Sequence, residues 1–575
     1  MIQYAGIQED EALFSIPFFQ PSTREFRIQA FHNKIPIMVM TYVGTLKTWI
    51  YWPLIRWFGS SVWSVRVPVV LVGAITVFIF YLLIRESLIP SARTTLGELE
   101  QHNGARRSLT AASFWHWGGQ RRPCAALAAS AGALLLATDP VFLLTNTFDW
   151  GPVALEHVLL VSGCFMLLRL ARTFSCTTEP TAAGPLPDLG EGRSGPVPLA
   201  KNHARVRFLA LGFFCFGLAL WNKALFVWAL SGLIAGALVV FWPAVRQCLT
   251  RRNAAIAVAA FLAGALPFVI YNLRHANATL SENAHFETDR MPAKWLQLER
   301  AADGSSLFGY MTSEDSDGPL KPPPTWRGRF AQWIWQRAGQ HRETEFFYVF
   351  GGMLLLAPLW WRIRAARFSL VFLIVAWSMM ALTKNAGASA HHDILLWPFP
   401  ILFAASVLAS IPWRWLSGLA AAAMVLMNLL VLNQYVLQFE RDGAAGGFTD
   451  AMFALNRELP ENQTIYVTDW GMNATLQLTH QGRLRIRSAQ GALEGDSPNP
   501  EQQAQLLAML SDSDAIWLEH VRGREFFEGG DEHLERFASM AGFQSDLVRT
   551  VPDSNGRPIY QIFRFRAPLP PVTAR

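Results

Sequence analysis

The chain has 575 residues, of which 51% are hydrophobic and only 16% are charged, and its mean hydropathy is +0.21. A soluble protein of this length would carry roughly a quarter charged residues, so the composition excludes an ordinary soluble globular protein. The net charge of +6 does not indicate nucleic-acid binding, because most basic residues fall in short loops between apolar runs.

The first 65 residues combine an acidic pair with a broken apolar segment. Asp10 and Glu11 stand ahead of the first long apolar run. Two carboxylates beside a membrane are costly to desolvate, so we expect them in a water-filled cavity. Segment 35–58 is apolar but interrupted by Lys47 and Pro53. It predicts amphipathic helices that lie along the membrane surface.

Residues 66–439 hold apolar runs long enough to cross a membrane, and we count about ten of them. We place them near 67–84, 124–144, 152–168, 208–221, 224–242, 254–271, 346–361, 368–382, 394–411 and 415–436. Arginine and lysine gather in the loops on one side, at 85–122, 169–207, 246–252, 362–367 and 414. The short opposite loops hold only Lys223 and Lys384. The basic side is therefore predicted to be cytoplasmic, with both chain ends outside.

Two polar regions are also expected outside. The loop 273–345 is polar and ends in a tryptophan-rich stretch. After about residue 440 the composition becomes that of a soluble domain, so 440–575 is predicted to be a small outer α/β domain. We expect its strands at 464–468, 483–488, 515–518, 544–551 and 558–565, and its helices at 472–480, 499–511 and 531–541.

The sequence lacks the signature motifs of several protein classes. The five cysteines fall in the spans or cytoplasmic loops, so no disulfide is expected in the outer domain. The sequence has no zinc-type Cys/His spacing, Walker loop or Gly-x-Ser-x-Gly motif. This argues against an ATP-driven pump and a serine hydrolase.

Three motifs carry a resemblance to a known family. They are the Asp10-Glu11 pair, Lys34 in the run 31–36, and the run 49–59 (WIYWPLIRWFG). Together they resemble the first outer loop of polytopic GT-C glycosyltransferases, and more narrowly the protein O-mannosyltransferase and lipid A aminoarabinose transferase branch. That branch has a transmembrane helix directly before its acidic pair, so we expect a further span upstream of Met1. The resemblance covers roughly residues 8–440.

The resemblance implies a GT-C-like helical bundle and a sugar-transfer reaction. The donor would be an undecaprenyl- or dolichyl-phosphate sugar, bound from the membrane, and the acceptor a glycan, lipid or protein on the outer side. No luminal β-trefoil domain is visible in the sequence, so a bacterial inner-membrane enzyme with a periplasmic active site is expected. These motifs specify a superfamily and not a substrate.

The resemblance also assigns candidate residues in the first outer loop. Asp10 matches the base that takes a proton from the acceptor hydroxyl, with Glu11 as a supporting or metal-binding carboxylate. The alternative is a solvated acidic patch. Lys34 falls where the family has a phosphate-binding lysine, although Ile35 separates it from the proline that should follow. The alternative is a lysine that snorkels to the membrane interface.

Later turns add further candidates. Asp149 matches the family's second acidic residue, with a plain helix N-cap as the alternative, and Glu156 lies one to two turns further on. A divalent cation stays open as a cofactor, with Glu11 and Asp149 as its candidate ligands, and no other cofactor is expected. Lys223 follows a span at an outer turn, where a phosphate contact and plain solvent exposure are the alternatives.

Histidines give the last candidates. His391 and His392 precede Asp393 at another outer turn, where they would bind substrate phosphate or a metal, although adjacent side chains point apart on a helix. In the 273–345 loop, His275, His285 and Glu287 are loose candidates for a metal ligand.

Two other functions fit a polytopic chain. A secondary transporter should show an internal repeat and Gly- or Pro-broken helices at matching positions, and the sequence shows neither. A non-catalytic membrane receptor, with 440–575 as its sensor, would not need Asp10, Lys34 and Asp149 on one side.

Overall fold

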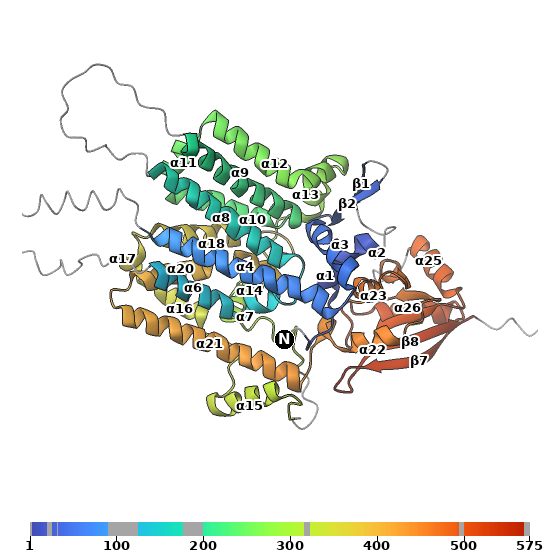
Figure 1. Cartoon of the computed structure of the whole chain (residues 1–575). Helices are drawn as coiled ribbons and strands as arrows, with labels where there is room; N and C mark the ends of the chain where they lie inside the picture. Colours follow the sequence, from blue (N-terminus) through green and yellow to red (C-terminus); the bar gives the residue numbers. More distant parts are fainter. Residues whose placement is uncertain are drawn as a thin grey trace, which may run out of the picture.

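The computed structural model describes residues 3–19, 26–30, 33–89, 125–175, 199–314, 322–493 and 499–567. Long helices lie side by side in a bundle, and a sheet domain sits at one end of it, beside the short N-terminal helices (Figure 1). The chain is thus a mostly helical, multi-pass membrane protein with a small C-terminal sheet domain.

Six helices within the described part of the chain are long and apolar enough to cross a membrane as single helices. They are α4 (Val62–Leu88), α8 (Val153–Ser175), α9 (Leu199–Asn222), α12 (Arg251–Arg274), α18 (Arg364–Ala381) and α21 (Arg414–Arg441).

Two more apolar stretches are pairs of helices bent at a break. The first joins α10 (Phe226–Val240) to α11 (Trp242–Cys248) at 99°. The second joins α19 (Ala390–Asp393) and the 3₁₀ turn Ile394–Leu396 to α20 (Phe399–Ser410) at 43°.

Two predicted spans are shorter apolar helices in the structure. One is α6 (Ala125–Thr138), followed by α7 (Pro140–Thr145), and the other is α16 (Phe346–Leu355), followed by α17 (Ala357–Trp360). Each of the predicted spans therefore coincides with an apolar helix. The basic loops 90–124 and 176–198 lie outside the described residues.

Glycine allows helices α9 and α12 to approach each other closely. A Cβ atom on Gly217 would lie 2.1 Å from the carbonyl oxygen of Phe261, and one on Gly264 would lie 2.5 Å from that of Phe214. Small residues let membrane helices approach until their backbones touch, which favours van der Waals packing where no hydrophobic effect drives association.

The N-terminal segment differs from the prediction in its first half. It contains α1 (Glu9–Ala12), the 3₁₀ turn Leu13–Ser15 and α2 (Ile16–Phe19). Then follow strands β1 (Phe26–Ala30), β2 (Asn33–Met40) and β3 (Val43–Gly44), and helix α3 (Leu46–Phe58). The prediction of helices over 35–58 is therefore wrong for 35–44. Those residues pair as antiparallel strands, and the β-branched Ile35, Ile37 and Val39 suit a strand.

The loop 273–345 contains three helices, α13 (Ala278–Asn283), α14 (Met291–Asp303) and α15 (Trp326–Ala338). Helix α15 lies along the end of α21, where Asn433 donates to the Ala331 carbonyl at 3.0 Å. Much of this polar loop is therefore folded onto the bundle.

The C-terminal domain confirms the predicted order of elements. After α22 (Ala451–Glu458) come β4 (Thr464–Val467), α23 (Asn473–Thr479), β5 (Arg485–Ser488), α24 (Gln490–Leu493), α25 (Pro500–Leu510), β6 (Ile516–His520), α26 (Gly530–Met540), β7 (Gln544–Pro552) and β8 (Pro558–Arg566).

The five strands form one sheet in the order β5-β4-β6-β8-β7, parallel at β5-β4-β6 and antiparallel at β6-β8-β7. Ile465 and Val467 pack with α22 and α23 on one face, whereas Tyr466 packs with α25 and α26 on the other. This alternation is the two-residue period of a strand buried on both faces. The domain is thus a three-layer α/β/α structure.

Candidate active site

The acidic segment is folded into a short capped helix. The side chain of Gln8 accepts hydrogen bonds from the backbone N–H groups of Asp10, at 2.8 Å, and Glu11, at 3.2 Å. Glu11 returns the contact to the Gln8 N–H, which completes a capping box. Successive residues on this turn point in different directions, so Glu9, Asp10 and Glu11 reach three different surroundings.

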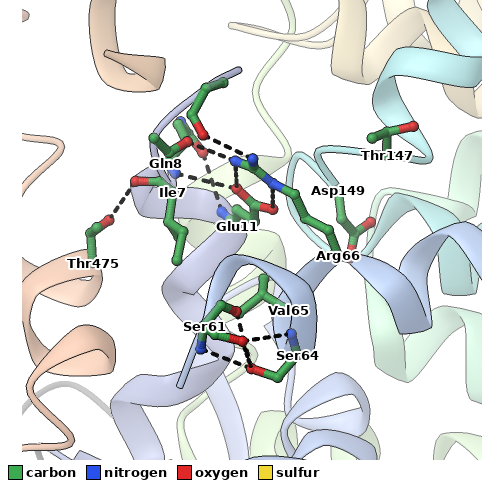
Figure 2. Close-up of polar contacts among 12 residues, drawn as sticks. Ile7, Gln8, Glu11, Ser61, Ser64, Val65, Arg66, Thr147, Asp149 and Thr475 are labelled. Carbon is green, nitrogen blue, oxygen red and sulfur yellow. Dashed lines mark hydrogen bonds and ion pairs between the residues drawn. The ribbon is translucent and has the colours of Figure 1, made fainter. Parts of the chain in front are cut away.

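Glu11 forms a buried ion pair with Arg66 of α4. Its two carboxylate oxygens accept from Arg66 Nε at 2.7 Å and Nη2 at 2.8 Å, and neither side chain is exposed (Figure 2). The same guanidinium donates to the carbonyl oxygens of Ala5 and Gly6 at 2.9 and 2.7 Å. A bidentate pair of this kind fixes geometry. Glu11 therefore anchors the acidic segment to the bundle. The Arg66 guanidinium occupies the place beside the Glu11 carboxylate where a metal ion would have to bind.

Asp149 contacts both the start of α8 and a buried lysine. One carboxylate oxygen accepts from the Ala154 N–H at 3.0 Å, as a cap of α8 would, and the other pairs with Lys47 Nζ at 2.7 Å. Asp149 has a φ of 24°, a left-handed backbone that costs a non-glycine residue about 1–3 kcal/mol. Lys47 also donates to the Glu11 carbonyl at 3.2 Å. The second acidic residue is thus held against the first acidic segment through a buried lysine.

Asp10 is the carboxylate of the segment that remains half-buried. Burial raises its pKa, and the nearby Lys223, Gln8, Trp150 and Lys47 oppose that rise. The charge of Asp10 in turn adds to burial in raising the pKa of Tyr42 to about 12. A raised pKa makes a carboxylate a stronger proton acceptor, while the two lysines favour its charged form.

Lys223 is buried, so the solvent-exposed alternative for this residue is wrong. It follows α9 directly, and the neighbouring Asn222 donates to Glu156 at 2.8 Å. Burial lowers the pKa of Lys223, while Asp10, Glu156 and Asp149 raise it. Within the described parts of the chain no carboxylate lies within 4.0 Å of its ammonium group. The positive charge of Lys223 is therefore not neutralised by a direct ion pair with any described residue.

Lys34 does not share the buried surroundings of Lys47 and Lys223. It stands on β2 opposite Gln29 with its side chain exposed, and its ammonium has no ion-pair partner among the residues that the structure describes. The structure therefore does not group Lys34 with the carboxylates, whereas Lys47 contacts both Asp149 and the Glu11 carbonyl. The physical reason is the hairpin, which turns Lys34 outward, whereas Lys47 begins α3 on its buried side. The sequence signal for Lys47 was a lysine inside an otherwise apolar run.

The two adjacent histidines line a polar cavity of about 300 Å³ that also includes Tyr42, His285 and Lys384. The His391 ring packs on Trp150 with centroids 4.9 Å apart, and His392 meets the edge of Trp228 at 5.9 Å. Because the charge of Asp10 raises the pKa of Tyr42, which lines the cavity, the cavity lies near the acidic segment. The structure therefore brings His391, His392 and His285 to one space.

The remaining loop candidates lie apart from this cavity. His275 packs between Phe26 and Tyr271, with centroids 5.1 and 4.8 Å away, and Glu287 pairs with Lys294 at 3.4 Å. Neither lines the cavity, so the structure does not group them with the histidines. In the described ranges no group of three His, Cys, Asp or Glu side chains is arranged to hold a metal ion.

Comparison with known proteins gives a likeness in fold. No family model and no curated protein matches the sequence. The crystal structure of ArnT from Cupriavidus metallidurans bound to undecaprenyl phosphate is similar over 98% of this chain and 95% of that one, with a TM-score of 0.50 and 12% identity. The apo form covers 97% and 93% with a TM-score of 0.42 and 13% identity. The chain therefore shares the overall fold of this ArnT structure.

Proposed function

We propose that the protein is a membrane glycosyltransferase that moves a sugar from a polyprenyl-phosphate donor to an acceptor hydroxyl. The observation that carries this proposal is the surroundings of Asp10. A half-buried carboxylate with a raised pKa lies beside buried Lys47 and Lys223, next to a polar cavity at one end of a membrane bundle.

The reaction needs a base and a stabilised leaving group. As the acceptor oxygen bonds to the anomeric carbon, the bond from that carbon to the phosphate oxygen breaks and the hydroxyl proton passes to Asp10. Negative charge then grows on the departing polyprenyl phosphate. Lys223, which has no direct ion pair in the described residues, is suited to stabilise it, and Lys47 adds charge from its place on Asp149.

The fold supports the choice of donor. The similar ArnT structure is bound to undecaprenyl phosphate, and a polyprenyl tail would lie in the bilayer while its phosphate meets the lysines. The polar cavity beside His391 and His392 gives the sugar or the acceptor room next to Asp10. The arginine-rich loops support a cytoplasmic opposite end, so we place the reaction and the C-terminal domain on the outer face of a bacterial inner membrane. The acceptor is a glycan, a lipid or a protein there.

The direct test is a donor panel. The full chain, purified into lipid nanodiscs, is incubated with undecaprenyl- and dolichyl-phosphate sugars and with lipid, glycan and peptide acceptors. We expect transfer from one donor class, detected by mass spectrometry of the acceptor and release of polyprenyl phosphate. Failure with every donor in membranes that hold folded protein would contradict the proposal.

A further inference from the structure

The C-terminal domain contacts the acidic segment at Glu9, the residue directly before Asp10. Both carboxylate oxygens of Glu9 lie 2.9 Å from the Ala474 backbone nitrogen, and Oε2 lies 3.5 Å from that of Thr475. These N–H groups belong to the first turn of α23, whose N-cap residue Met472 provides no side-chain hydrogen bond. Glu9 therefore satisfies donors that a helix leaves without a partner of its own.

Two further hydrogen bonds link the same stretch of chain to the domain. Thr475 Oγ1 donates to the Ile7 carbonyl at 3.2 Å, as Figure 2 shows, and the Gly6 N–H donates to the Phe448 carbonyl at 2.7 Å. A Cβ atom on Gly6 would lie 2.1 Å from the carbonyl oxygen of Thr449, so glycine permits this approach. Gly6, Ile7 and Glu9 thus each form a hydrogen bond with the domain.

An aromatic contact reaches Asp10 by a second route. Phe448 lies at the entrance to the C-terminal domain and meets Trp150 and Tyr310, with centroids 6.1 and 5.9 Å apart. Trp150 stacks on Tyr310 with ring centroids 4.2 Å apart, and its proximity to Asp10 opposes the rise in the pKa of that carboxyl. The domain therefore touches both the chain before Asp10 and the ring beside it.

We propose that Glu9 is a positioning residue through which the C-terminal domain holds Asp10 in its catalytic orientation. The inference rests on the proposed function, because only a reaction at Asp10 gives its orientation a consequence. Helix α1 has four residues, and a helix that short does not hold its own shape in water. Its orientation therefore depends on tertiary contacts, of which Arg66 supplies one side and α23 the other.

The chemistry of the contact selects the informative variants. Burial raises the pKa of Glu9 to about 7, against the lowering effect of the Ala474 and Thr475 N–H groups. A neutral side chain that keeps an oxygen acceptor should therefore preserve the contact, so Glu9→Gln is the conservative variant and Glu9→Ala removes the acceptor. Thr475→Val removes the second link at nearly constant volume. Glu461→Ala is the matched control, because Glu461 pairs with Arg483 on the surface of the same domain.

Turnover is measured in nanodiscs with the full chain and its active donor. We expect Glu9→Ala to lower kcat by about 10- to 100-fold, as a misplaced catalytic group does, with the donor KM unchanged. Thr475→Val should lower kcat in the same sense but less, and Glu9→Gln and Glu461→Ala should stay within a few-fold of the parent. Parental turnover by Glu9→Ala, or an equal loss in Glu9→Gln, would overturn the assignment.

Hydrogen exchange gives a readout that does not depend on activity. In Glu9→Ala, amides of residues 6–14 and 473–479 should exchange faster than in the parent and in Glu9→Gln, while helix α12 stays unchanged. Unchanged exchange in both segments would overturn the contact itself. If the parent transfers no sugar from any donor, the proposed function fails, and the exchange result still decides whether Glu9 holds the two parts together.

Discussion

Lys223 and Lys34 form a natural pair for comparison, because one is buried beside Asp10 and the other is exposed on β2. Lys223→Met should raise the donor KM by about 10- to 100-fold, the worth of one hydrogen bond to a charged group. Lys34→Met should leave it within two-fold. Donor binding measured by KM and by direct titration checks this. Equal effects of the two changes would contradict the placement of the leaving phosphate at Lys223.

The Glu11–Arg66 pair should show itself in stability. Arg66→Met leaves the Glu11 carboxylate buried without its partner, which costs about 3–5 kcal/mol for pairs of this kind. The double change Glu11→Gln with Arg66→Met removes the stranded charge and should recover much of that loss. Thermal unfolding in nanodiscs measures both variants. A double variant less stable than Arg66→Met would show that Glu11 is not held by this pair alone.

Part of the candidate site can be predicted from the sequence. The family resemblance indicates Asp10 and Asp149, and the position at an outer turn indicates Lys223; the structure places the three close enough for each carboxylate to influence the lysine. Lys34 was chosen because it resembles a family motif, and Lys47 was overlooked. A motif gives the spacing along the chain but not the direction of a side chain, which here depends on the hairpin register.

Some secondary-structure elements could likewise be predicted from local sequence patterns, and others could not. Long apolar runs could be predicted as helices, because in a membrane a helix satisfies its own backbone hydrogen bonds. The central strands β4 and β6 could be predicted from their short apolar runs, since a strand buried on both faces has this pattern. The strand nature of 35–44 could not, because a short apolar run gives no period long enough to separate strand from helix. The contact of α23 with Glu9 joins residues far apart in the chain, and no local pattern shows it.

Two acidic side chains, Glu519 on β6 and Asp531 on α26, should make the stability of the C-terminal domain depend on pH. Burial and the neighbouring Asp531 and Glu535 raise the pKa of Glu519 to about 9, and burial and Glu525 raise that of Asp531 to about 7. Both values exceed those of the unfolded chain, so the folded domain binds protons more tightly, and its stability should fall as pH rises from about 4 to about 9.

Unfolding of the C-terminal domain between pH 5 and pH 9.5 tests this, with intrinsic tryptophan fluorescence as the probe. Glu519→Gln should flatten the dependence, because the amide has no proton to lose. Surface Glu528→Gln is the control and should keep the parental slope. Stability that rises with pH in the parent would contradict the sign.

At the scale of the whole molecule, the two ends of the bundle should face different compartments. A reporter fused at residue 100 or 190 should lie in the cytoplasm, and a reporter fused at residue 443 should lie outside the cytoplasm. These positions follow from the arginine-rich loops and from the exit of α21 into the C-terminal domain. An external reporter at residue 100 or 190 would invert the topology and remove the acidic segment from the outer face.

The most direct test of the account is the rate of sugar transfer by Asp10→Asn, measured in nanodiscs alongside donor binding. The substitution preserves size and hydrogen bonding but removes the base, so transfer should fall by about 10²- to 10⁴-fold. Donor binding should survive, because the lysines and not the aspartate meet the phosphate. Transfer at the parental rate by a folded Asp10→Asn protein would show that Asp10 is not the base and would contradict the proposed mechanism.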